Sequence, residues 1–292
     1  MKLLRSLTYY RFLFRKTNDE IIFSSIKNPI LVLTVAFNNV EFVELQIALL
    51  KKYFDEQFHH CVLDNSTIPS VRERLKSVSS KNAVSYFGLP KGPFSDHKSH
   101  GAAMHWGFFQ VIRKFKPQYF GYLDHDIFPF KEFKLIEKLH QGIYGRVVNS
   151  YIKGGGYLNQ RTEQAPFWSL WAGFCFFDLA RFKGLFPWEY NFSSQHFPGG
   201  YFLDTGGGLW ESIYSKTVYP GILATFRKFK WNTNDDEGDQ NDCFEILDEA
   251  WIHFVSLSNW RTIKDLEGKK AKLEEILYKA RNQEGLNLQE IK

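Results

Sequence analysis

The feature that most constrains the fold is an unbroken apolar run, PILVLTVAFNN, which begins at Pro29 and ends in two asparagines. A segment that is apolar on both faces and rich in β-branched residues is typical of a strand inside a parallel sheet. The next segment, VEFVELQIALLKKYF over 40–54, has its apolar residues at helical spacing. It is followed by HHCVLDNST, a second short strand that ends in Asp64-Asn65-Ser66. Strand, helix and strand in this order predict a βαβ unit and an α/β fold.

Further strands and helices follow this unit. The sequence predicts a short helix over 71–78, a third strand over 83–87, a helix over 99–115 and a fourth strand that reads YFGYLDHD. Beyond Phe130 it predicts, in chain order, a helix over 131–140, strands within 145–160 and 166–182, a helix that ends at Tyr214, a strand over 217–223 and a charged helix over 263–283. Ligands of open α/β sheets bind outside the carboxyl ends of the strands. The acids that end the fourth strand therefore lie where a ligand is expected.

The chain of 292 residues is long enough to bury one substantial core. We expect one α/β domain over 29–262, with halves 29–130 and 131–262, between an N-terminal basic and aromatic segment (1–28) and a charged C-terminal helix (263–292). The first segment mixes aromatic and aliphatic residues with Arg5, Arg11, Arg15 and Lys16. This mixture favours either peripheral contact with a membrane surface or a helix packed on the domain.

The composition limits the classes of function. A formal net charge of +5 is too small an excess to indicate a nucleic-acid-binding protein. No apolar run reaches the roughly 18 residues of a membrane span, and the N-terminus lacks a secretory cleavage site. Three cysteines without CxxC spacing predict neither a disulfide framework nor a zinc cluster. We therefore expect a protein of the cytoplasm or of the inner face of the membrane.

The fourth strand ends in two carboxylates, Asp124 and Asp126, on either side of His125. Two acids this close repel each other unless a cation compensates them. Carboxylate oxygens are the ligands of hard divalent cations such as Mg²⁺ and Mn²⁺, so the pair predicts a metal site that anchors a diphosphate. His125 is expected to point to the opposite face of the extended segment and to be structural.

The order of the motifs resembles that of glycosyltransferases of the GT-A fold, in particular family 2-like nucleotide-diphospho-sugar transferases. The resemblance covers about 29–260 and consists of VLTVAFNN, CVLDNST, HKSHGAAMHWG, YLDHD, SLWAGFCFFD, FLDTGGGLW and AWIHF. It implies a single Rossmann-like domain with a central mixed, mostly parallel sheet flanked by helices, in which 29–130 binds the nucleotide sugar and 131–262 the acceptor. It also implies a hexosyltransferase of polysaccharide biosynthesis. This enzyme would move a sugar from a nucleotide-diphosphate sugar, with a UDP-sugar favoured, to a hydroxyl of a glycan or lipid-linked glycan.

The same resemblance gives roles to individual residues. Mn²⁺ or Mg²⁺ would be held by Asp124, Asp126 and His253. The nucleotide sugar would contact Asn38, Asp64, Asn65, Lys98, Gly101 and Asp124, and the acceptor would contact Trp171, Gly173 and Trp210. Asp204 takes the position of the catalytic base of an inverting mechanism, although Leu203 stands where the family usually has glutamate. Without a base at Asp204, a retaining mechanism stays open.

Two other classes of function stay open. A nucleotidyltransferase acting on sugar phosphates also uses strand-end acids, but VAFNN stands where its glycine-rich signature with a following Arg and Lys would be. A non-catalytic carbohydrate- or nucleic-acid-binding module would use the aromatic content of 17% and the basic charge. In such a module the paired acids would be idle or would repel phosphates.

Overall fold

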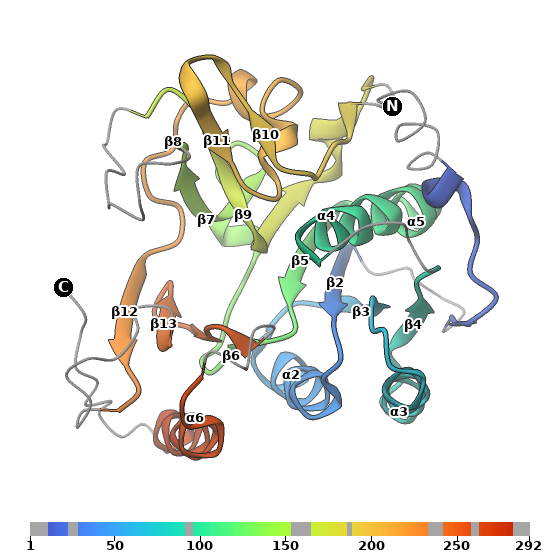
Figure 1. Cartoon of the computed structure of the whole chain (residues 1–292), viewed down its shortest axis with the longest axis vertical. Helices are drawn as coiled ribbons and strands as arrows, with labels where there is room; N and C mark the ends of the chain where they lie inside the picture. The colour runs from blue at the N-terminus through green and yellow to red at the C-terminus, as the bar shows by residue number, and fades with distance from the viewer. Residues whose placement is uncertain are drawn as a thin grey trace.

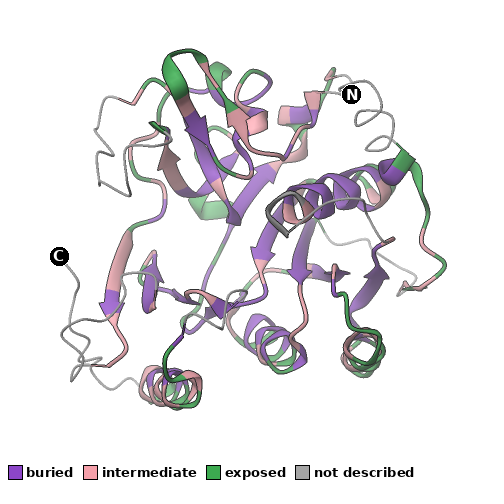
Figure 2. Ribbon diagram, viewed as in Figure 1, coloured by how far each residue is buried: buried purple, intermediate pink, exposed green. Residues whose placement is uncertain are grey.

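The computed structural model describes residues 11–22, 29–90, 96–152, 165–185, 189–232, 242–257 and 263–282, except for the side chains of 96–98. At its centre is a mixed seven-stranded sheet with helices on both faces, which confirms the α/β class (Figure 1). The strand order is β1-β4-β3-β2-β5-β9-β7. Buried residues are concentrated in the central strands and in the helix faces turned toward them (Figure 2).

Four neighbouring strands of this sheet are parallel: β4 (Ser85–Gly88), β3 (Phe58–Asp64), β2 (Ile30–Ala36) and β5 (Tyr119–Asp124). At one edge, β1 (Glu20–Ile21) pairs antiparallel with β4; at the other, β9 (Trp168–Asp178) pairs antiparallel with both β5 and β7 (Ile143–Asn149). Every residue of β2 is buried, as its apolar run predicts. The carboxyl ends of the four parallel strands lie at one edge and bring their loops together.

The helices follow the predicted alternation with strands. One face of the sheet is covered by α2 (Val40–Tyr53) and α3 (Pro69–Lys81). The other face is covered by α4 (Asp96–Gly107), which continues through the π-helical turn η1 (Phe108–Ile112) into α5 (Arg113–Phe115). The side chain of Asn39 accepts a hydrogen bond from the Phe42 N–H and caps α2 at its start.

Two smaller sheets complete the fold. The second sheet has the order β12-β13-β14-β6, formed by Phe226–Lys230, Cys243–Leu247, Trp251–Phe254 and Ile127–Pro129. The third has the order β10-β11-β8, formed by Gln195–His196, Tyr201–Leu203 and Tyr151–Ile152. Because β6 follows β5 after a two-residue turn, the acid-bearing turn joins the central sheet to the second sheet.

Three of the elements expected beyond Phe130 were wrong. Over 131–140 there is only the 3₁₀ turn η2 (Ile136–Lys138), because Phe133 exchanges main-chain hydrogen bonds with Tyr53 and Asp55 after α2. The helix expected up to Tyr214 is replaced by the 3₁₀ turns η6 (Gly207–Leu209) and η7 (Tyr214–Lys216). The segment 217–223 is irregular rather than a strand, because Val218 and Ile222 have no core to enter and are 73% and 76% exposed.

The ends of the described chain belong to the same body as the domain. Strand β1 adds the N-terminal segment to the central sheet, and β9 and β7 make the predicted halves 29–130 and 131–262 share that sheet. The predicted tail helix is confirmed as α6 (Leu266–Arg281), whose Leu273, Ile276 and Leu277 pack against Phe residues of the second sheet. None of the described helices is both long and apolar enough to cross a membrane.

If α6 is an integral part of the fold, Leu273→Ala will lower the free energy of unfolding by about 2–5 kcal/mol, because it leaves a cavity against the second sheet. Urea denaturation followed by circular dichroism measures this. Glu274→Ala, which removes an exposed neighbour, is the control and is expected to change stability by less than about 0.5 kcal/mol. Equal effects of the two substitutions would show that α6 is not part of the cooperative unit.

Candidate functional site

The turn between β5 and β6, which carries the acids, is held by a buried glutamine. Gln46 of α2 is fully buried, and its Nε2 donates to the carbonyls of Asp124 and Ile127, at 2.7 Å each. Its Oε1 accepts from Thr34 Oγ1 at 2.6 Å, and that hydroxyl also lies 2.8 Å from His60 Nε2. Buried polar groups without partners are costly, so this network fixes the turn in one arrangement.

Asp126 and His253 lie together at the junction of the two sheets. His253 Nε2 is 3.6 Å from Asp126 Oδ1, and His253 Nδ1 is 2.8 Å from Glu245 Oε2 on the adjacent strand β13. Glu245 Oε2 also accepts from Arg146 Nη1 at 2.9 Å. All four side chains are buried, and positive and negative groups alternate along them.

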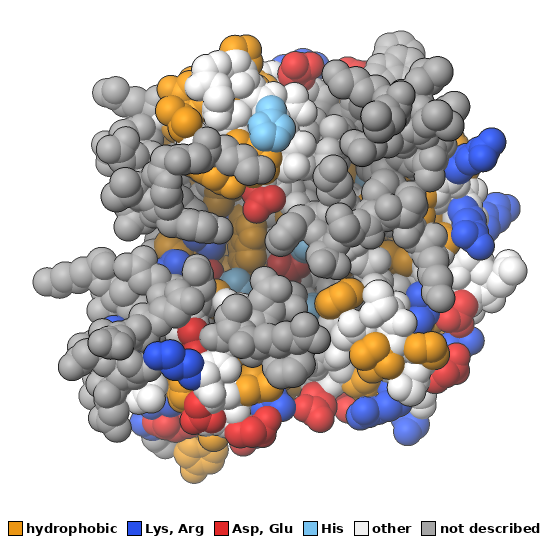
Figure 3. All heavy atoms as spheres, in the orientation of Figure 1, with side chains coloured by type: hydrophobic (Ala, Val, Ile, Leu, Met, Phe, Trp, Pro, Cys, Tyr) orange, Lys and Arg blue, Asp and Glu red, His pale blue; other side chains and the backbone are white. Residues whose placement is uncertain are grey.

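Asp124 lies on the other side of the turn, between α4 and β9. Its Oδ1 is 3.3 Å from His100 Nε2 of α4. On β9, Gly173 leaves room for its other oxygen, because a Cβ at Gly173 would lie 2.4 Å from Asp124 Oδ2. The predicted residues Asp124, Asp126, Gly173 and His253 are therefore brought together. In the space-filling view, acidic and histidine side chains lie in a hollow near the middle of the molecule (Figure 3).

The pKa values of Asp124 and Asp126 are shifted in opposite directions. Burial raises the pKa of Asp124, against the opposing effect of His100. Burial would also raise the pKa of Asp126, but the charge of His253 outweighs it and lowers that pKa. Burial would lower the pKa of His253, yet Asp126 and Glu245 together raise it to about 9. Opposite pKa shifts in neighbouring carboxyl groups are typical of sites that do chemistry.

The donor atoms can be tested for their fit to a divalent cation. Asp126 Oδ1 is buried without a hydrogen-bond partner, and it lies 3.6 Å from His253 Nε2, a separation that two ligands of one ion can have. Among the described residues, however, no group of three or more His, Cys, Asp or Glu side chains has the arrangement of a metal site. The residues fit a cation that takes one or two protein ligands and fills its other positions with substrate oxygens and water.

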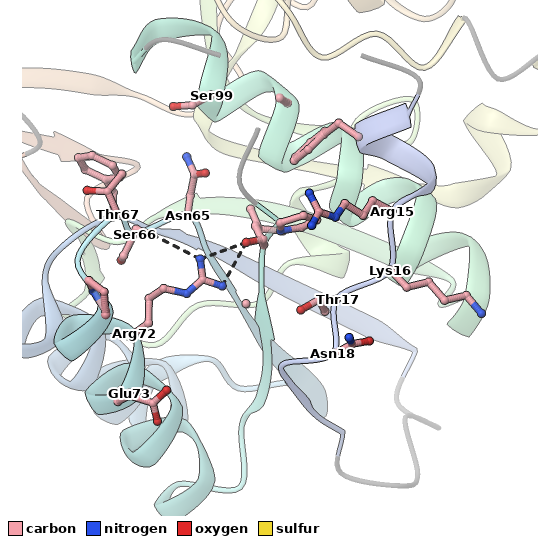
Figure 4. A pocket seen from close by; sticks show the side chains of 17 residues that line it. Arg15, Lys16, Thr17, Asn18, Asn65, Ser66, Thr67, Arg72, Glu73 and Ser99 are labelled. Atoms are coloured by element: carbon pink, nitrogen blue, oxygen red, sulfur yellow. Dashed lines mark hydrogen bonds between the residues drawn. The ribbon is translucent and has the colours of Figure 1, made fainter. Parts of the chain in front are cut away.

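A cavity of about 750 Å³ lies at the carboxyl ends of β2, β3 and β4 (Figure 4). Its walls come from the loops after these strands, from α4 and from the N-terminal segment, and include Phe37, Asn65, Ser66, Leu89, Ser99 and Ala102. The volume lies within the usual range for small-molecule and cofactor sites. Ser99 and Ala102 line the cavity while His100, between them on α4, reaches Asp124, so one helix connects the cavity with the acids.

The residues predicted to hold the nucleotide sugar differ in their relation to this cavity. Asn65 lines it. Asp64 is fully buried and outside the lining, where its Oδ2 accepts from Tyr86 Oη at 2.7 Å. The side chain of Asn38 accepts from the Thr67 N–H and donates to Thr67 Oγ1, so it joins the loops after β2 and β3. Gly101 is a close contact, because a Cβ there would lie 2.9 Å from the Phe192 carbonyl. Lys98 is in α4, with its side chain outside the described residues.

The residues expected in the acceptor half lie along β9 and the loop after β11. Trp171 is half-buried beside His253, with the ring centroids 4.8 Å apart. Trp210 belongs to an aromatic group with Phe167, Trp168 and Phe197. Asp204 is exposed, and its Oδ1 accepts from the Thr205 N–H at 2.7 Å. The loop that Asp204 begins packs on β9, since a Cβ at Gly206 would lie 2.9 Å from the Leu170 carbonyl.

Three residues of the site were not found by sequence reasoning. Gln46 and Arg146 bind partners 78–99 positions away in the chain, so no local pattern indicates them. Glu245 lies two positions after Cys243 in a strand that the sequence did not predict; the apolar composition of CFEIL around this one acid was the available signal. His125 is buried with its Nδ1 3.3 Å from the Val35 carbonyl, which places its ring against the main chain of β2.

No protein-family model matches the chain, and no curated protein matches it.

The alternating charges of Arg146, Glu245, His253 and Asp126 predict how the pKa of His253 responds to loss of a neighbouring charge in the protein without added metal. Glu245→Gln is expected to lower the pKa of His253 from about 9 by about 1–3, because a neighbouring negative charge is lost. An NMR titration of the His253 ring protons measures it. Glu249→Gln, at an exposed carboxylate paired with Arg227, is the control and is expected to leave His253 unchanged.

The sign of the linked stability follows from the same shift. The pKa of His253 is above its ordinary value of 6.5 in the folded protein, so its stabilising contribution is complete below pH 6.5 and is lost as the pH rises through about 9. If His253 titrates near 6.5 in the wild type, the described ion pairs with Asp126 and Glu245 do not form in solution.

Proposed function

We propose that the protein is a metal-dependent glycosyltransferase, which transfers a sugar from a nucleotide-diphosphate sugar to a hydroxyl of a glycan or lipid-linked acceptor. One observation carries the proposal: α4 lines a cavity of nucleotide-compatible volume through Ser99 and Ala102 and contacts Asp124, the first acid of the strand-end pair, through His100. A nucleotide whose base and ribose occupy the cavity would direct its diphosphate along α4 toward Asp124 and Asp126. The GT-A likeness is further supported by the antiparallel strand β9, which separates the parallel strands from β7.

Each part of the site has a task in this reaction. Asp126, with Asp124 beside it, would hold Mn²⁺ or Mg²⁺, and His253 would join them as a ligand by releasing the proton that its raised pKa otherwise retains. When bound, the ion supplies Lewis-acid stabilisation of the diphosphate leaving group. Asn65, Ser66 and Thr67 offer hydrogen bonds to the base and ribose. Trp171, half-buried beside the acids, offers an apolar face for a sugar ring.

Asp204 is the proposed general base. Its exposed carboxylate would take the proton of the acceptor hydroxyl while the hydroxyl oxygen bonds to the anomeric carbon and the bond from that carbon to the diphosphate breaks. The nucleoside diphosphate leaves, and the configuration at the anomeric carbon inverts. A cytoplasmic location follows as part of the proposal, because nucleotide sugars would be drawn from there.

The metal role is tested with purified Asp126→Ala. We expect it to lose metal-dependent hydrolysis of nucleotide sugars, because the diphosphate is no longer anchored, while its circular dichroism stays native. A screen of UDP-, GDP-, ADP- and CDP-sugars with Mn²⁺ measures donor loss without knowledge of the acceptor. Asp242→Ala, at an acid just before β13 that pairs with Lys269, is a charge-matched control. Full hydrolysis by Asp126→Ala refutes the proposal, and release of nucleoside monophosphate and sugar 1-phosphate in place of nucleoside diphosphate indicates attack at phosphorus, the chemistry of a nucleotidyltransferase.

The base role is tested separately with Asp204→Asn. Transfer to an acceptor is expected to fall by about 10²–10⁴-fold, because the hydroxyl loses its proton acceptor. Binding of nucleoside diphosphate and Mn²⁺, measured by calorimetry, is expected to stay within about twofold of wild type. Retained transfer would remove Asp204 from the mechanism and reopen a retaining one.

A further inference from the structure

A line of charged side chains crosses the second sheet from the acid-bearing turn to the outer strand β12. His253 of β14 is paired in register with Ile127 of β6, which directly follows Asp126. Glu245 of β13 lies opposite His253, and Lys228 of β12 lies opposite Glu245. Residues directly opposite each other in an antiparallel sheet point to the same face. The side chains of His253, Glu245 and Lys228 therefore share the face of the second sheet that carries the site.

Lys228 ends this line with a partly buried charge. Its Nζ is 3.5 Å from Glu245 Oε1, and 30% of its side chain is exposed. The other oxygen of the same carboxylate, Oε2, is engaged by Arg146 Nη1 at 2.9 Å and by His253 Nδ1 at 2.8 Å. Lys228 thus makes the longest of the three contacts with Glu245. An ammonium group has three donors, so donors of Lys228 remain for a further partner.

The charges around Glu245 do not balance. Burial would raise the pKa of Glu245, but Arg146 and His253 outweigh it and lower that pKa to about 2, so the carboxylate is charged at neutral pH. Arg146 and Lys228 carry two positive charges against this single negative one. The surplus does not depend on His253, and it therefore persists whether or not His253 gives up its proton to a metal ion.

The position of Lys228 relative to the cavity places it on the acceptor side of the acids. The cavity lies at the carboxyl ends of β2, β3 and β4, whereas β12 and β13 lie on the other side of β6 (Figure 1). Neighbouring strands lie about 4.8 Å apart, so Lys228 begins about 10 Å from His253, two strands away. A nucleotide sugar that reaches the acids from the cavity would leave the space toward Lys228 to the acceptor.

An aromatic wall connects Lys228 with Trp171, which is expected to contact the acceptor. The guanidinium carbon of Arg146 lies 5.3 Å from the centroid of the Trp171 ring and 3.7 Å from that of Phe226. Phe226 is two positions before Lys228 on β12, so both side chains point to the same face. Trp171 also lies beside His253. A sugar ring at this wall would have the Lys228 ammonium at one end and the acids at the other.

We infer that Lys228 binds an anionic group, a phosphate or a carboxylate, of the acceptor. The inference rests on the proposed function and deepens it, because it gives the class of acceptor: a glycan or lipid-linked glycan with a negative charge close to the hydroxyl that reacts. A lysine ammonium is a compact charge that suits either group. Because the charge of Lys228 is partly buried, water and salt screen its attraction for an anion less than that of a fully exposed lysine.

The experiment measures transfer from the donor found in the nucleotide-sugar screen to matched acceptors. Each methyl hexoside is offered as the neutral sugar, as the uronate with a carboxylate at C6, and as the 6-phosphate. Lys228→Met removes the charge and keeps a long side chain, and Lys228→Arg restores the charge. Arg227→Met is the control, because Arg227 points to the opposite face of β12 and pairs with Glu249. Donor hydrolysis without acceptor and circular dichroism are measured for every variant.

We expect the wild type to have a KM for a charged acceptor at least about 10-fold below that for its neutral form, as one charge-assisted hydrogen bond provides. Lys228→Met is expected to lose this difference through a higher KM, while its kcat and its donor hydrolysis stay within about twofold of wild type. Lys228→Arg and Arg227→Met are expected to keep the difference. Preference for the uronate identifies a carboxylate, and preference for the 6-phosphate identifies a phosphate.

Three results overturn the inference. If the wild type uses no charged acceptor better than its neutral form, no anion is bound. If Lys228→Met keeps the preference, another group binds the anion. If Lys228→Met loses donor hydrolysis as well, Lys228 acts on the donor and not on the acceptor. Failure of the wild type to hydrolyse any nucleotide sugar would instead refute the proposed function, and the inference would fail with it.

Discussion

The alternating row of buried charges, Arg146, Glu245, His253 and Asp126, is the interaction on which the rest of the site depends. Each charge lies beside one of opposite sign, from β7 through β13 and β14 to the turn after β5. A buried ion without compensation costs several kcal/mol, so each charge of the row stabilises its neighbours. Because its members come from the central sheet and from the second sheet, it fixes how the two sheets meet, and with them the position of Asp126.

The row also shows why the two aspartates differ although they are two positions apart. Asp126 faces the cationic His253, whereas Asp124 faces half-buried His100 and the space left by Gly173. Asp126 is held in its charged form by its buried neighbour His253, and Asp124 borders the open side of the turn. A ligand that arrives along α4 would meet Asp124 first. The firmly placed charge behind it does not need to move.

The sequence was informative wherever the determining interactions are local. The apolar run over 30–36, the helical spacing over 40–53 and the acids at the end of β5 are all patterns within one element, and the structure contains each of them. The same patterns do not say which side chain of a strand-end group faces outward. Asp64 turns into the sheet toward Tyr86, and its neighbour Asn65 lines the cavity instead.

Long-range contacts explain the rest of what the sequence did not reveal. The helix predicted over 131–140 does not form, because Phe133 makes main-chain hydrogen bonds with the end of α2, about 80 residues earlier. Such a tertiary contact overrides local helix propensity and cannot be predicted from it. In the sequence, Gln46 is an ordinary polar position of an amphipathic helix. Its role follows only from the fold, which places the carbonyls of Asp124 and Ile127 within its hydrogen-bonding reach. The N-terminal segment reads as basic and aromatic, and only its anchoring by Trp106 and Asp19 turns it toward the cavity.

Glycines set how closely the second half of the chain approaches the first. Gly101 of α4 admits the Phe192 carbonyl, Gly206 admits the Leu170 carbonyl, and Gly173 admits the carboxylate of Asp124; a Cβ at any of these would lie within 2.9 Å of its neighbour. In all three, a glycine stands where another residue's oxygen occupies the space of a side chain. The loop that carries Asp204 is thereby packed on β9 and against the residues that contact α4, the helix shared by the cavity and the acids. The proposed role of Asp204 as a base therefore depends on these close contacts, because a side chain at any of the three glycines would push the elements of the site apart.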